Sequence, residues 1–416
     1  MQIDSGNTAW VLASSALVLL MTPGLAFFYG GLVRRKNAGA IIMQNFMTIG
    51  LVGIVWVLWG YSLAFGPDHG GFIGDFSWFG LKHVDTNPVA FYGGGKIPHQ
   101  ANMIFQAMFA IITPALITGA FADRMKFSAF CIFIVLWSTF VYLPIAHWVW
   151  AIDANGPSGW LGKLGARDFA GGTVVHINAG VAALVAAWLV FRKRIGFQQE
   201  PMAAHNVPFV VLGAGLLWFG WFGFNAGSAL AADSFAINAF VVTNTATCAA
   251  LVAWVFMSWM FAKKPSIIGA ASGAVAGLVA ITPASGFVGP MPAIAIGVGA
   301  GVFCYTAVVF LQKLHVDDSL AVFGVHGVGG MWGALATGIF SGVGFSLAAL
   351  PDGVSRMKQI GYQLTGIGAT IGWSFAITLI ILLAIKMTIG VQVSKEEEEQ
   401  GLDVSQHGEP AYQLEE

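Results

Sequence analysis

Charged residues are scarce in this sequence, since Asp, Glu, Lys and Arg make up only 9% of its 416 residues. Hydrophobic residues make up 57%, and the mean hydropathy is +0.75. About a quarter of the residues in a soluble globular domain are charged, so this composition excludes that class. The apolar residues form continuous runs of about twenty, the length of a membrane-spanning helix, whereas the short alternating segments typical of a membrane β-barrel are missing. We therefore expect an all-α polytopic membrane protein.

Cysteine is also rare, and its three residues, Cys131, Cys248 and Cys304, all lie inside apolar runs. Their spacing fits neither a disulfide framework nor a metal cluster, so we expect packing roles and no cofactor. The sequence begins MQIDSGNTAW, without the basic stretch that opens a signal peptide, so no uncleaved signal peptide is expected unless the numbering starts at a mature end. The net charge of −1 gives no indication of a nucleic-acid partner, and none is expected.

Glycine, by contrast, is abundant, and its 54 residues favour helices that approach one another closely in a membrane. Eleven apolar segments are long enough to cross a bilayer. The expected spans are residues 8–31, 38–65, 99–122, 127–150, 169–191, 207–230, 236–262, 266–286, 292–312, 319–347 and 362–391. The tenth span has the least certain end, because GIFSGVGFSLAALPDG fits either a helix terminus or a re-entrant stretch.

Lysine and arginine are distributed unevenly between the two sets of loops. One set contains Arg34, Arg35, Lys36, Arg124, Lys126, Arg192, Lys193, Arg194, Lys263, Lys264 and Lys313. The other set contains only Lys82, Lys96, Lys163, Arg167, Arg356 and Lys358, mostly among aspartates. Because cytoplasmic loops are enriched in Lys and Arg, the first set is expected to be cytoplasmic. With an odd number of spans, the N-terminus then lies outside the cell membrane and the C-terminus inside.

Two histidines occupy equivalent positions in spans five and ten. Asp168 precedes His176 by eight residues, as Asp318 precedes His326, and a glycine follows each histidine four residues later. Since five crossings separate the two spans, they enter the membrane from opposite faces, which predicts a five-plus-five inverted repeat with one extra helix. In such folds the substrate path lies between the repeats. The aspartates are placed near helix N-termini, where capping explains them somewhat better than substrate contact.

A neutral imidazole is much less costly to bury than a charged group, so both rings are expected to be neutral at rest. Two adjacent rings can share one N–H···N hydrogen bond and leave outward nitrogens for a small polar molecule or a proton. A single intramembrane histidine is as easily a structural residue, but the symmetric placement of His176 and His326 favours a conduction path. A zinc site is less favoured, because no Cys, Glu or Asp accompanies the pair in ligand register.

Aromatic residues exceed what interfacial belts require, with 33 Phe and 15 Trp. Phe105 and Phe109 lie one helical turn apart, and Phe224 and Ser228 do so as well, so that a ring and a hydroxyl share one helix face. Ring faces can stabilise a partly dehydrated cation by about 0.5–2 kcal/mol each, while a serine oxygen accepts one of its N–H groups. For each single ring, composition alone does not distinguish cation binding from a place in an interfacial belt or a role in packing.

Many segments, in order along the chain, resemble the ammonium transporter family, the Amt branch of the Amt/Mep/Rh superfamily. They are TPGLAFFYGGLVRRKN, FADRMKFSAF, PIAHWVWA, DFAGGTVVHINAG, GWFGFNAGSA, KPSIIGAASGAVAGLVAITPASG, VDDSLAVFGVHGVGG and GLDVSQHGEPAY. The resemblance covers nearly the whole chain and implies a transporter rather than an enzyme.

The resemblance implies an outer recruitment site for ammonium, or methylammonium as its analogue. There, Trp150 and Phe109 offer ring faces, Ser228 accepts a hydrogen bond, and the Asp168 carboxylate supports the site. Phe109 and Phe224 resemble the stacked phenyl gate beneath it.

For the pore, the resemblance implies that His176 and His326 are the twin histidines of a narrow apolar path. Thr282 matches a position in the family's TPA segment near the pore, and Phe105, one helical turn before Phe109, is a further candidate site residue. Some family members carry a further acidic residue where Ala321 stands here, which weakens a relay through that position. A bare ion costs too much to bury, so we expect ammonium to be deprotonated and neutral ammonia to pass. The proton is then either lost outward or carried separately along the histidines, and the resemblance favours separate transfer with net charge movement.

The chain is expected to divide into a transmembrane domain, residues 1–391, and a cytoplasmic tail, residues 392–416. The acidic run KEEEEQ and the last four residues are expected to be a solvated, disordered end. By resemblance, GLDVSQHGEPAY docks under the helices and touches a neighbouring protomer, the protein is a homotrimer in membrane lipid, and a PII-type regulator binds its cytoplasmic face.

Three alternatives remain open on the sequence. An ammonium sensor would signal through the tail, although no kinase, cyclase or other soluble domain is recognisable in the sequence. An Rh-like channel would conduct ammonia without net charge. A membrane enzyme would need a carboxylate, metal or nucleophile converging on the histidine pair, and none is evident.

Overall fold

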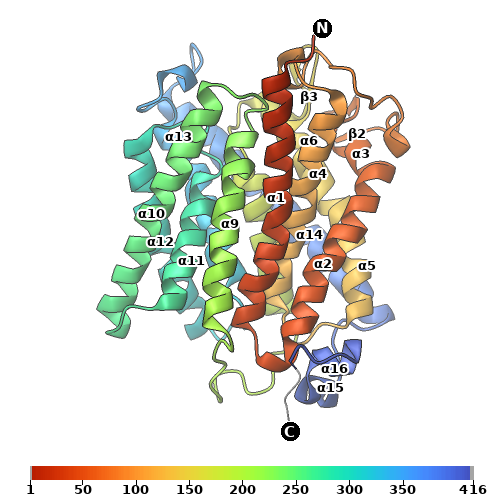
Figure 1. The fold of residues 1–416 in the computed structure, drawn as a ribbon, viewed down its shortest axis with the longest axis vertical. Helices are drawn as coiled ribbons and strands as arrows, with labels where there is room; N and C mark the ends of the chain where they lie inside the picture. The colour runs from red at the N-terminus through yellow and green to blue at the C-terminus, as the bar shows by residue number, and fades with distance from the viewer. Residues whose placement is uncertain (1, 413–416) are drawn as a thin grey trace.

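The computed structural model describes residues 2–412, and in this range eleven helical units are bundled side by side (Figure 1). Nine of these described units are long and apolar enough to cross a membrane. The other two are α11 (Ile267–Ile281) and the unit formed by η9 (Phe323–Gly327) and α13 (Val328–Phe340). The predicted fold class, an all-α membrane protein with eleven spans, is confirmed.

Six of the described units are single helices and five are composite. The single helices are α1 (Ser5–Leu32), α9 (Val207–Gly227), α10 (Ser234–Ala262), α11, α12 (Pro290–Lys313) and α14 (Arg356–Thr388). The composite units are α2 (Ala38–Val55) with η2 (Trp56–Gly60) and α3 (Tyr61–Phe65); α4 (His99–Ile117) with η5 (Thr118–Ala120); α5 (Phe127–Trp137) with η6 (Ser138–Tyr142) and α6 (Leu143–Trp150); η7 (Gly172–Ile177) with α8 (Asn178–Leu184) and η8 (Val185–Val190); and η9 with α13.

Short elements occupy the connecting loops. They are η1 (Arg35–Asn37), η3 (Phe79–Leu81), η4 (Gly93–Gly95), α7 (Trp160–Leu164), η10 (Ser346–Ala348), and the antiparallel pairs β1 (Asp68–His69) with β2 (Ile73–Gly74) and β3 (Ile152–Asp153) with β4 (Gly156–Pro157). Two further helices, α15 (Lys395–Gln400) and α16 (Leu402–His407), form the tail.

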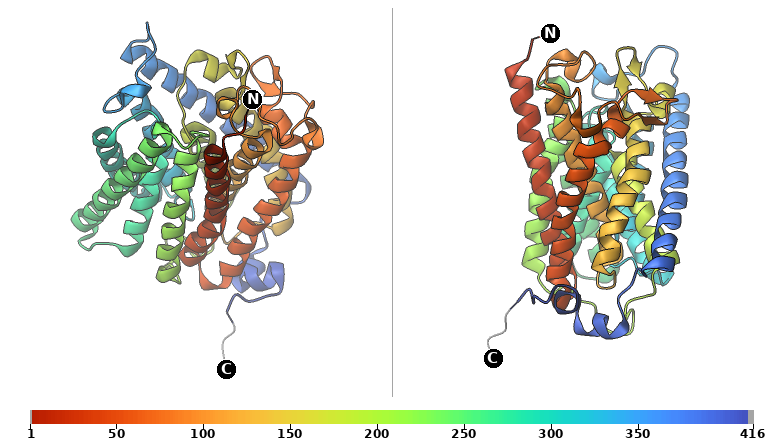
Figure 2. Two further views of the ribbon diagram at one scale, coloured as in Figure 1. Left: turned by 45° about the horizontal axis from the view of Figure 1, so that its top comes forward. Right: turned by 90° about the vertical axis from the view of Figure 1, so that its right-hand side faces the viewer.

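The start of α1 and the tail helices α15 and α16 lie at opposite ends of the bundle (Figures 1 and 2), called here the N-terminal end and the C-terminal end. Helices α1 and α9 lie antiparallel, since Trp10 Nε1 donates to Ala226 O at one end and Asn206 N donates to Gly31 O at the other. Their backbones almost touch, because a Cβ added to Gly213 would lie 2.3 Å from Phe28 N. Small residues therefore permit the close approach expected of membrane helices.

The two histidine-bearing units also meet along their backbones. A Cβ on Gly180, four residues after His176, would lie 2.3 Å from Gly327 N, and a Cβ on Gly330, four residues after His326, would lie 2.9 Å from Gly172 O. This reciprocal packing is what the inverted repeat predicts. Both histidines lie in π-helical turns, η7 and η9, a local widening that is frequent at functional sites.

Several predicted span boundaries were wrong. The tenth span ends at Phe340 rather than 347, because Gly342 and Gly344 have φ of 79° and 70° and turn the chain into a loop. The eighth span ends at Ile281 rather than 286. The eleventh begins at Arg356 rather than 362, where the Ser355 side chain accepts the N–H of Lys358 and caps the helix.

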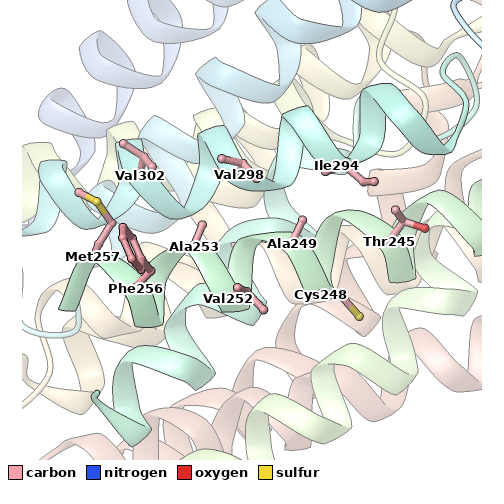
Figure 3. Close-up of a pocket in the computed structure, with 10 residues that line it drawn as sticks. All are labelled: Thr245, Cys248, Ala249, Val252, Ala253, Phe256, Met257, Ile294, Val298 and Val302. Carbon is pink, nitrogen blue, oxygen red and sulfur yellow. The ribbon is translucent and has the colours of Figure 1, made fainter. Parts of the chain in front are cut away.

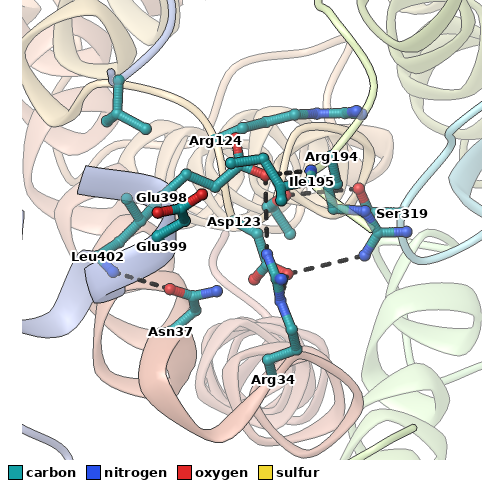
Figure 4. Close-up of polar contacts among 12 residues, drawn as sticks. Arg34, Asn37, Asp123, Arg124, Arg194, Ile195, Ser319, Glu398, Glu399 and Leu402 are labelled. Carbon is teal, nitrogen blue, oxygen red and sulfur yellow. Dashed lines mark hydrogen bonds and ion pairs between the residues drawn. The ribbon is translucent and has the colours of Figure 1, made fainter. Parts of the chain in front are cut away.

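The prediction that KEEEEQ is a disordered end was also wrong, because this run forms α15. Ser394 and Glu397 make a capping box at its start. Glu398 is buried, forms an ion pair with Arg192, and accepts the N–H of Ile195 at 2.7 Å (Figure 4). Partner charges thus hold the acidic run at the C-terminal end of the bundle. Residues 413–416, also predicted to be disordered, lie outside the described residues.

Helix α16 is held by η1 and by the start of α2. Leu402 N donates to Asn37 Oδ1 at 2.8 Å (Figure 4), and Ala40 N donates to Asp403 Oδ1 at 2.7 Å. The segment GLDVSQHGEPAY therefore docks beneath the helices of its own chain.

Candidate functional site

A cavity of about 150 Å³ lies near the N-terminal end, and three predicted site residues, Phe109, Trp150 and Ser228, line it together. Its other lining residues are Phe65, Tyr92, Asn102, Gln106, Ile152, Phe169 and Leu230. We call this space the outer cavity. Its walls are mostly aromatic, with a few polar groups between the rings.

The orientation of Ser228 and Trp150 is fixed by backbone hydrogen bonds. Ser228 Oγ donates its proton to Phe224 O at 2.8 Å, so the hydroxyl oxygen has only lone pairs to offer to the cavity. Trp150 Nε1 donates to Asp168 O at 2.9 Å, which holds the indole ring at the cavity wall. A pure acceptor beside ring faces is suited to a small cation that donates N–H bonds.

Two stacked phenyl rings lie next to this cavity. The ring centroids of Phe109 and Phe224 are 4.2 Å apart and the planes are tilted by 32°, while Phe109 meets Trp150 edge-on at 5.8 Å. Both phenyl side chains are about 1% exposed. Phe105 packs edge-on against Phe109 at 5.0 Å and so supports the predicted gate from behind.

The two predicted pore histidines contact each other. His176 Nδ1 and His326 Nδ1 are 3.3 Å apart, a hydrogen bond in which one ring donates and the other accepts. The rings are stacked with centroids 5.4 Å apart, and the Phe224 ring lies 6.1 Å from that of His176. The side chains from Trp150 to His326 therefore form a continuous row.

Thr282 contacts Trp221, whose ring packs against the row of side chains. Its hydroxyl donates to Leu278 O and accepts the indole N–H of Trp221, both at 2.8 Å. The Trp221 ring in turn stacks on His176 with centroids 5.4 Å apart. Thr282 thus orients the ring that holds His176 in place.

Asp168 caps the helix that carries His176. Its carboxylate accepts the backbone N–H groups of Gly171, Gly172 and Thr173 at 2.7–2.8 Å, as well as the Thr173 hydroxyl. These donors compensate the negative charge of the carboxylate. The helix dipole also stabilises a negative charge at this N-terminus. The carboxylate therefore has a structural role. Asp168 is linked to the outer cavity by its backbone carbonyl, which accepts the indole N–H of Trp150.

A second cavity, of about 400 Å³, lies on the other side of the histidine pair, and we call it the inner cavity. His326 lines its deep end, and Met202, Gln312 and Ser319 line it toward the C-terminal end. The pair and the phenyl rings thus separate two cavities that lie toward opposite ends of the bundle. Within residues 2–412, no cluster of three or more His, Cys, Asp or Glu side chains is placed to hold a metal ion.

Sequence reasoning missed three side chains of the site. Trp221, which stacks on His176, precedes Phe224 by one helical turn on α9, and that spacing was a usable signal. Asn102 and Gln106 lie one turn apart on α4, the helix of Phe109. Among the described residues, Asn102 Oδ1 and Gln106 Oε1 have no hydrogen-bond partner although both are buried beside the outer cavity.

Comparisons with known proteins agree across the whole chain. The model of the Ammonium Transporter Family matches residues 9–412. The ammonium transporter of Bacillus subtilis is 46% identical over 99% of both chains. Ammonium transporter Amt1 of Archaeoglobus fulgidus is 45% identical over 99% of this chain and 100% of its own.

Solved structures show the same fold. The crystal structure of Saccharomyces cerevisiae Mep2 superposes with a TM-score of 0.86 at 36% identity, covering 95% of this chain and 91% of its own. A structure described as a sensor Amt protein superposes with a TM-score of 0.89 at 32% identity, covering 97% and 98%.

Proposed function

Because the chain belongs to the ammonium transporter family, we propose that it recruits ammonium in the outer cavity, deprotonates it, and conducts ammonia past His176 and His326 while the proton crosses separately. The observation that carries this proposal is the row of side chains from Trp150 to His326 between two cavities. The N-terminal end faces outward, since most Lys and Arg residues of the loops belong to the C-terminal end. The relatives are transporters, which supports a transport role rather than catalysis.

Recruitment depends on few but directed contacts. The ring faces of Trp150 and Phe109 contribute about 0.5–2 kcal/mol each to a desolvated cation. The oxygen of Ser228 accepts one N–H of ammonium, and the amide oxygens of Asn102 and Gln106 are available for others. These contacts suit an ion with four N–H donors better than a spherical cation of similar size.

Deprotonation follows from the path beyond the gate. Moving a bare ion into an apolar interior costs on the order of 20 kcal/mol in the idealised Born limit and several kcal/mol after relaxation. The row past Phe224 offers rings and the two imidazoles, which cannot compensate that cost. Ammonia, being neutral, avoids it, so ammonium gives up its proton near the gate.

The histidine pair is suited to carry that proton. Each ring has one nitrogen engaged at the 3.3 Å Nδ1 contact and one remaining nitrogen. A proton that arrives at His176 Nε2 is passed on by exchange across the shared hydrogen bond and leaves from His326 Nε2. One net charge then moves for each ammonium.

The deciding experiment records the flux of labelled methylammonium and the electrical current together in proteoliposomes. The wild-type protein should show both signals. His176→Ala and His326→Ala should lower the ammonium current at least tenfold or lose discrimination against potassium, because the relay is interrupted. His315→Ala, an exposed histidine at the C-terminal end, is the matched control and should behave as wild type. Unchanged current and selectivity in both pore variants would exclude the relay.

A sensor role is the second candidate, favoured by the fold shared with the sensor Amt protein. In a sensor, ammonium binding would alter the docked tail with little flux. The same proteoliposome assay separates the two roles, since a sensor binds methylammonium without moving it. Methylammonium flux without current would instead indicate an electroneutral, Rh-like channel.

The assembly proposed for this chain is a homotrimer in the membrane. A surface groove of about 770 Å³ between α10 and α12 supports it (Figure 3). The groove is lined by Thr245, Cys248, Ala249, Val252, Ala253, Phe256, Met257, Ile294, Val298 and Val302. Small residues at intervals of four along α10 are typical of helix contacts in membranes. A PII-type protein is the regulator proposed for the cytoplasmic face, where the tail is docked.

A further inference from the structure

One carboxyl group at the inner end of the path has no role in the function proposed above. Asp318 lies between α12 and η9, and its Oδ2 accepts the N–H of Phe323 at 2.7 Å, which caps the helix that carries His326. Its Oδ1 is shielded from solvent and has no hydrogen-bond partner within residues 2–412. Buried carboxylate oxygens are nearly always paired, because desolvation without compensation is costly. The second oxygen is therefore not explained by capping.

Asp318 and His326 line the same inner cavity of about 400 Å³. That volume has room for on the order of ten water molecules at about 30 Å³ each. Among the cavity-lining residues that the structure describes, Asp318 is the only carboxylic acid, and the phenols of Tyr29 and Tyr305 are the other titratable groups besides His326. Only Asp318 can therefore take up a proton from His326 and hold it as a neutral acid.

We propose that Asp318 is the inner proton acceptor of the transport path. The inference rests on the proposed function, in which the proton reaches His326. The Nε2–H bond of the His326 imidazolium breaks, water in the inner cavity passes a proton on, and a new O–H bond forms on the Asp318 carboxylate, which lines that cavity. His326 becomes neutral again, and the carboxylic acid then releases its proton to cytoplasmic water.

The surroundings of Asp318 set the pH at which it can accept. Burial raises the pKa of its carboxyl group to about 6, while the N–H groups of Phe323 and Val322 and the positive charge of Arg124 act in the opposite direction. Asp317, the next carboxylate, adds a smaller increase. The acceptor form, the carboxylate, is thus present above an internal pH of about 6 and is lost below it.

Asp318→Asn tests the role with the least structural change. The amide oxygen of asparagine can still accept the N–H of Phe323, so the cap is retained, but the residue can no longer ionise. In vesicles with the cytoplasmic face inside, Asp318→Asn should lower the ammonium-driven current at least tenfold. Asp318→Glu, which restores an ionisable group, should recover a measurable part of the current. Ser272→Ala, a neutral change in the same cavity, is the matched control and should keep the wild-type current.

The internal pH profile distinguishes a proton acceptor from a merely structural residue. At internal pH 5, roughly one Asp318 carboxyl in ten is ionised, so the wild-type current should fall about tenfold from its value at pH 7. The residual current of Asp318→Asn should lack this decline. A wild-type current and pH profile in Asp318→Asn would overturn the inference and leave the proposed function standing. Methylammonium flux without any wild-type current would overturn separate proton transfer, and this inference with it.

Discussion

Ser228 illustrates how a single hydroxyl can select for a donor cation. Its proton is committed to Phe224 O, so only lone pairs face the outer cavity. Ser228→Ala should weaken ammonium recognition by about 1–2 kcal/mol, because one hydrogen bond to a charged donor is lost. The measurement is the ammonium concentration for half-maximal current, which should rise roughly 5- to 30-fold. Ser15→Ala is the control, since that buried hydroxyl likewise donates to a backbone carbonyl, Val11 O, but does not line the cavity. Equal effects in the two variants would return Ser228 to a structural role.

At the residue scale, the sequence could predict the side chains that perform chemistry better than those that position them. The paired histidines were detectable because buried imidazoles at matched spacings are unusual in an apolar chain. Trp221 was missed because its one-turn spacing from Phe224 places both rings on one face of α9 but does not show that Trp221 stacks on His176. Its relation to His176 and Thr282 depends on three units, η7, α9 and α11, that only tertiary packing brings together.

Helix α15 shows how charge can dock an element that has no apolar side chain, since its sequence is KEEEEQ. Helix α15 has six residues, too short to be stable alone. Its buried Glu398 pairs with Arg192 and lies 3.8 Å from Arg34 (Figure 4). The docking of α15 therefore depends on one buried carboxylate paired with partly exposed arginines, and it should be sensitive to loss of that charge.

Glu398→Gln should release the tail, because it leaves Arg192 without its counter-charge. Hydrogen exchange of residues 395–407 should speed up by tenfold or more, and a protease should cleave there sooner. Glu396→Gln is the matched control, since that acid lies on the same helix and is exposed. Equally slow exchange in both variants would show that α15 is held by other contacts.

The helices and the tail differ in how far the sequence predicts them. The membrane spans were predictable because a helix needs about twenty apolar residues to cross the bilayer, regardless of the helices that it packs against. The acidic run was misjudged because its composition is that of a disordered segment. Its partners, Arg192 and the N–H of Ile195, lie about two hundred positions earlier in the chain and cannot be inferred from local composition.

For the whole molecule, the open question is which face meets another copy. Every outward face of a membrane protein is apolar, so hydrophobic exposure alone does not distinguish lipid from protein contacts. The groove between α10 and α12 differs in shape, because Thr245, Ala249 and Ala253 recur at intervals of four along α10 and face branched side chains on α12 (Figure 3). Such a groove lets a helix of a neighbouring copy approach closely, whereas flexible lipid tails need no preformed groove.

Filling that groove should therefore disrupt a trimer without unfolding the protomer. Ala249→Trp places a large ring where a partner helix would lie, and the expected result is a shift from trimer to monomer in native mass spectrometry from mild detergent. Ile380→Trp, on the exposed face of α14, is the control for adding an indole to a lipid-facing surface and should leave the trimer intact. If both variants stay trimeric, the groove holds lipid and the interface lies elsewhere.

Because each protomer contains its own complete row from Trp150 to His326, the Ala249→Trp monomer should still conduct ammonium. A loss of current in that monomer would show that the path needs its neighbours.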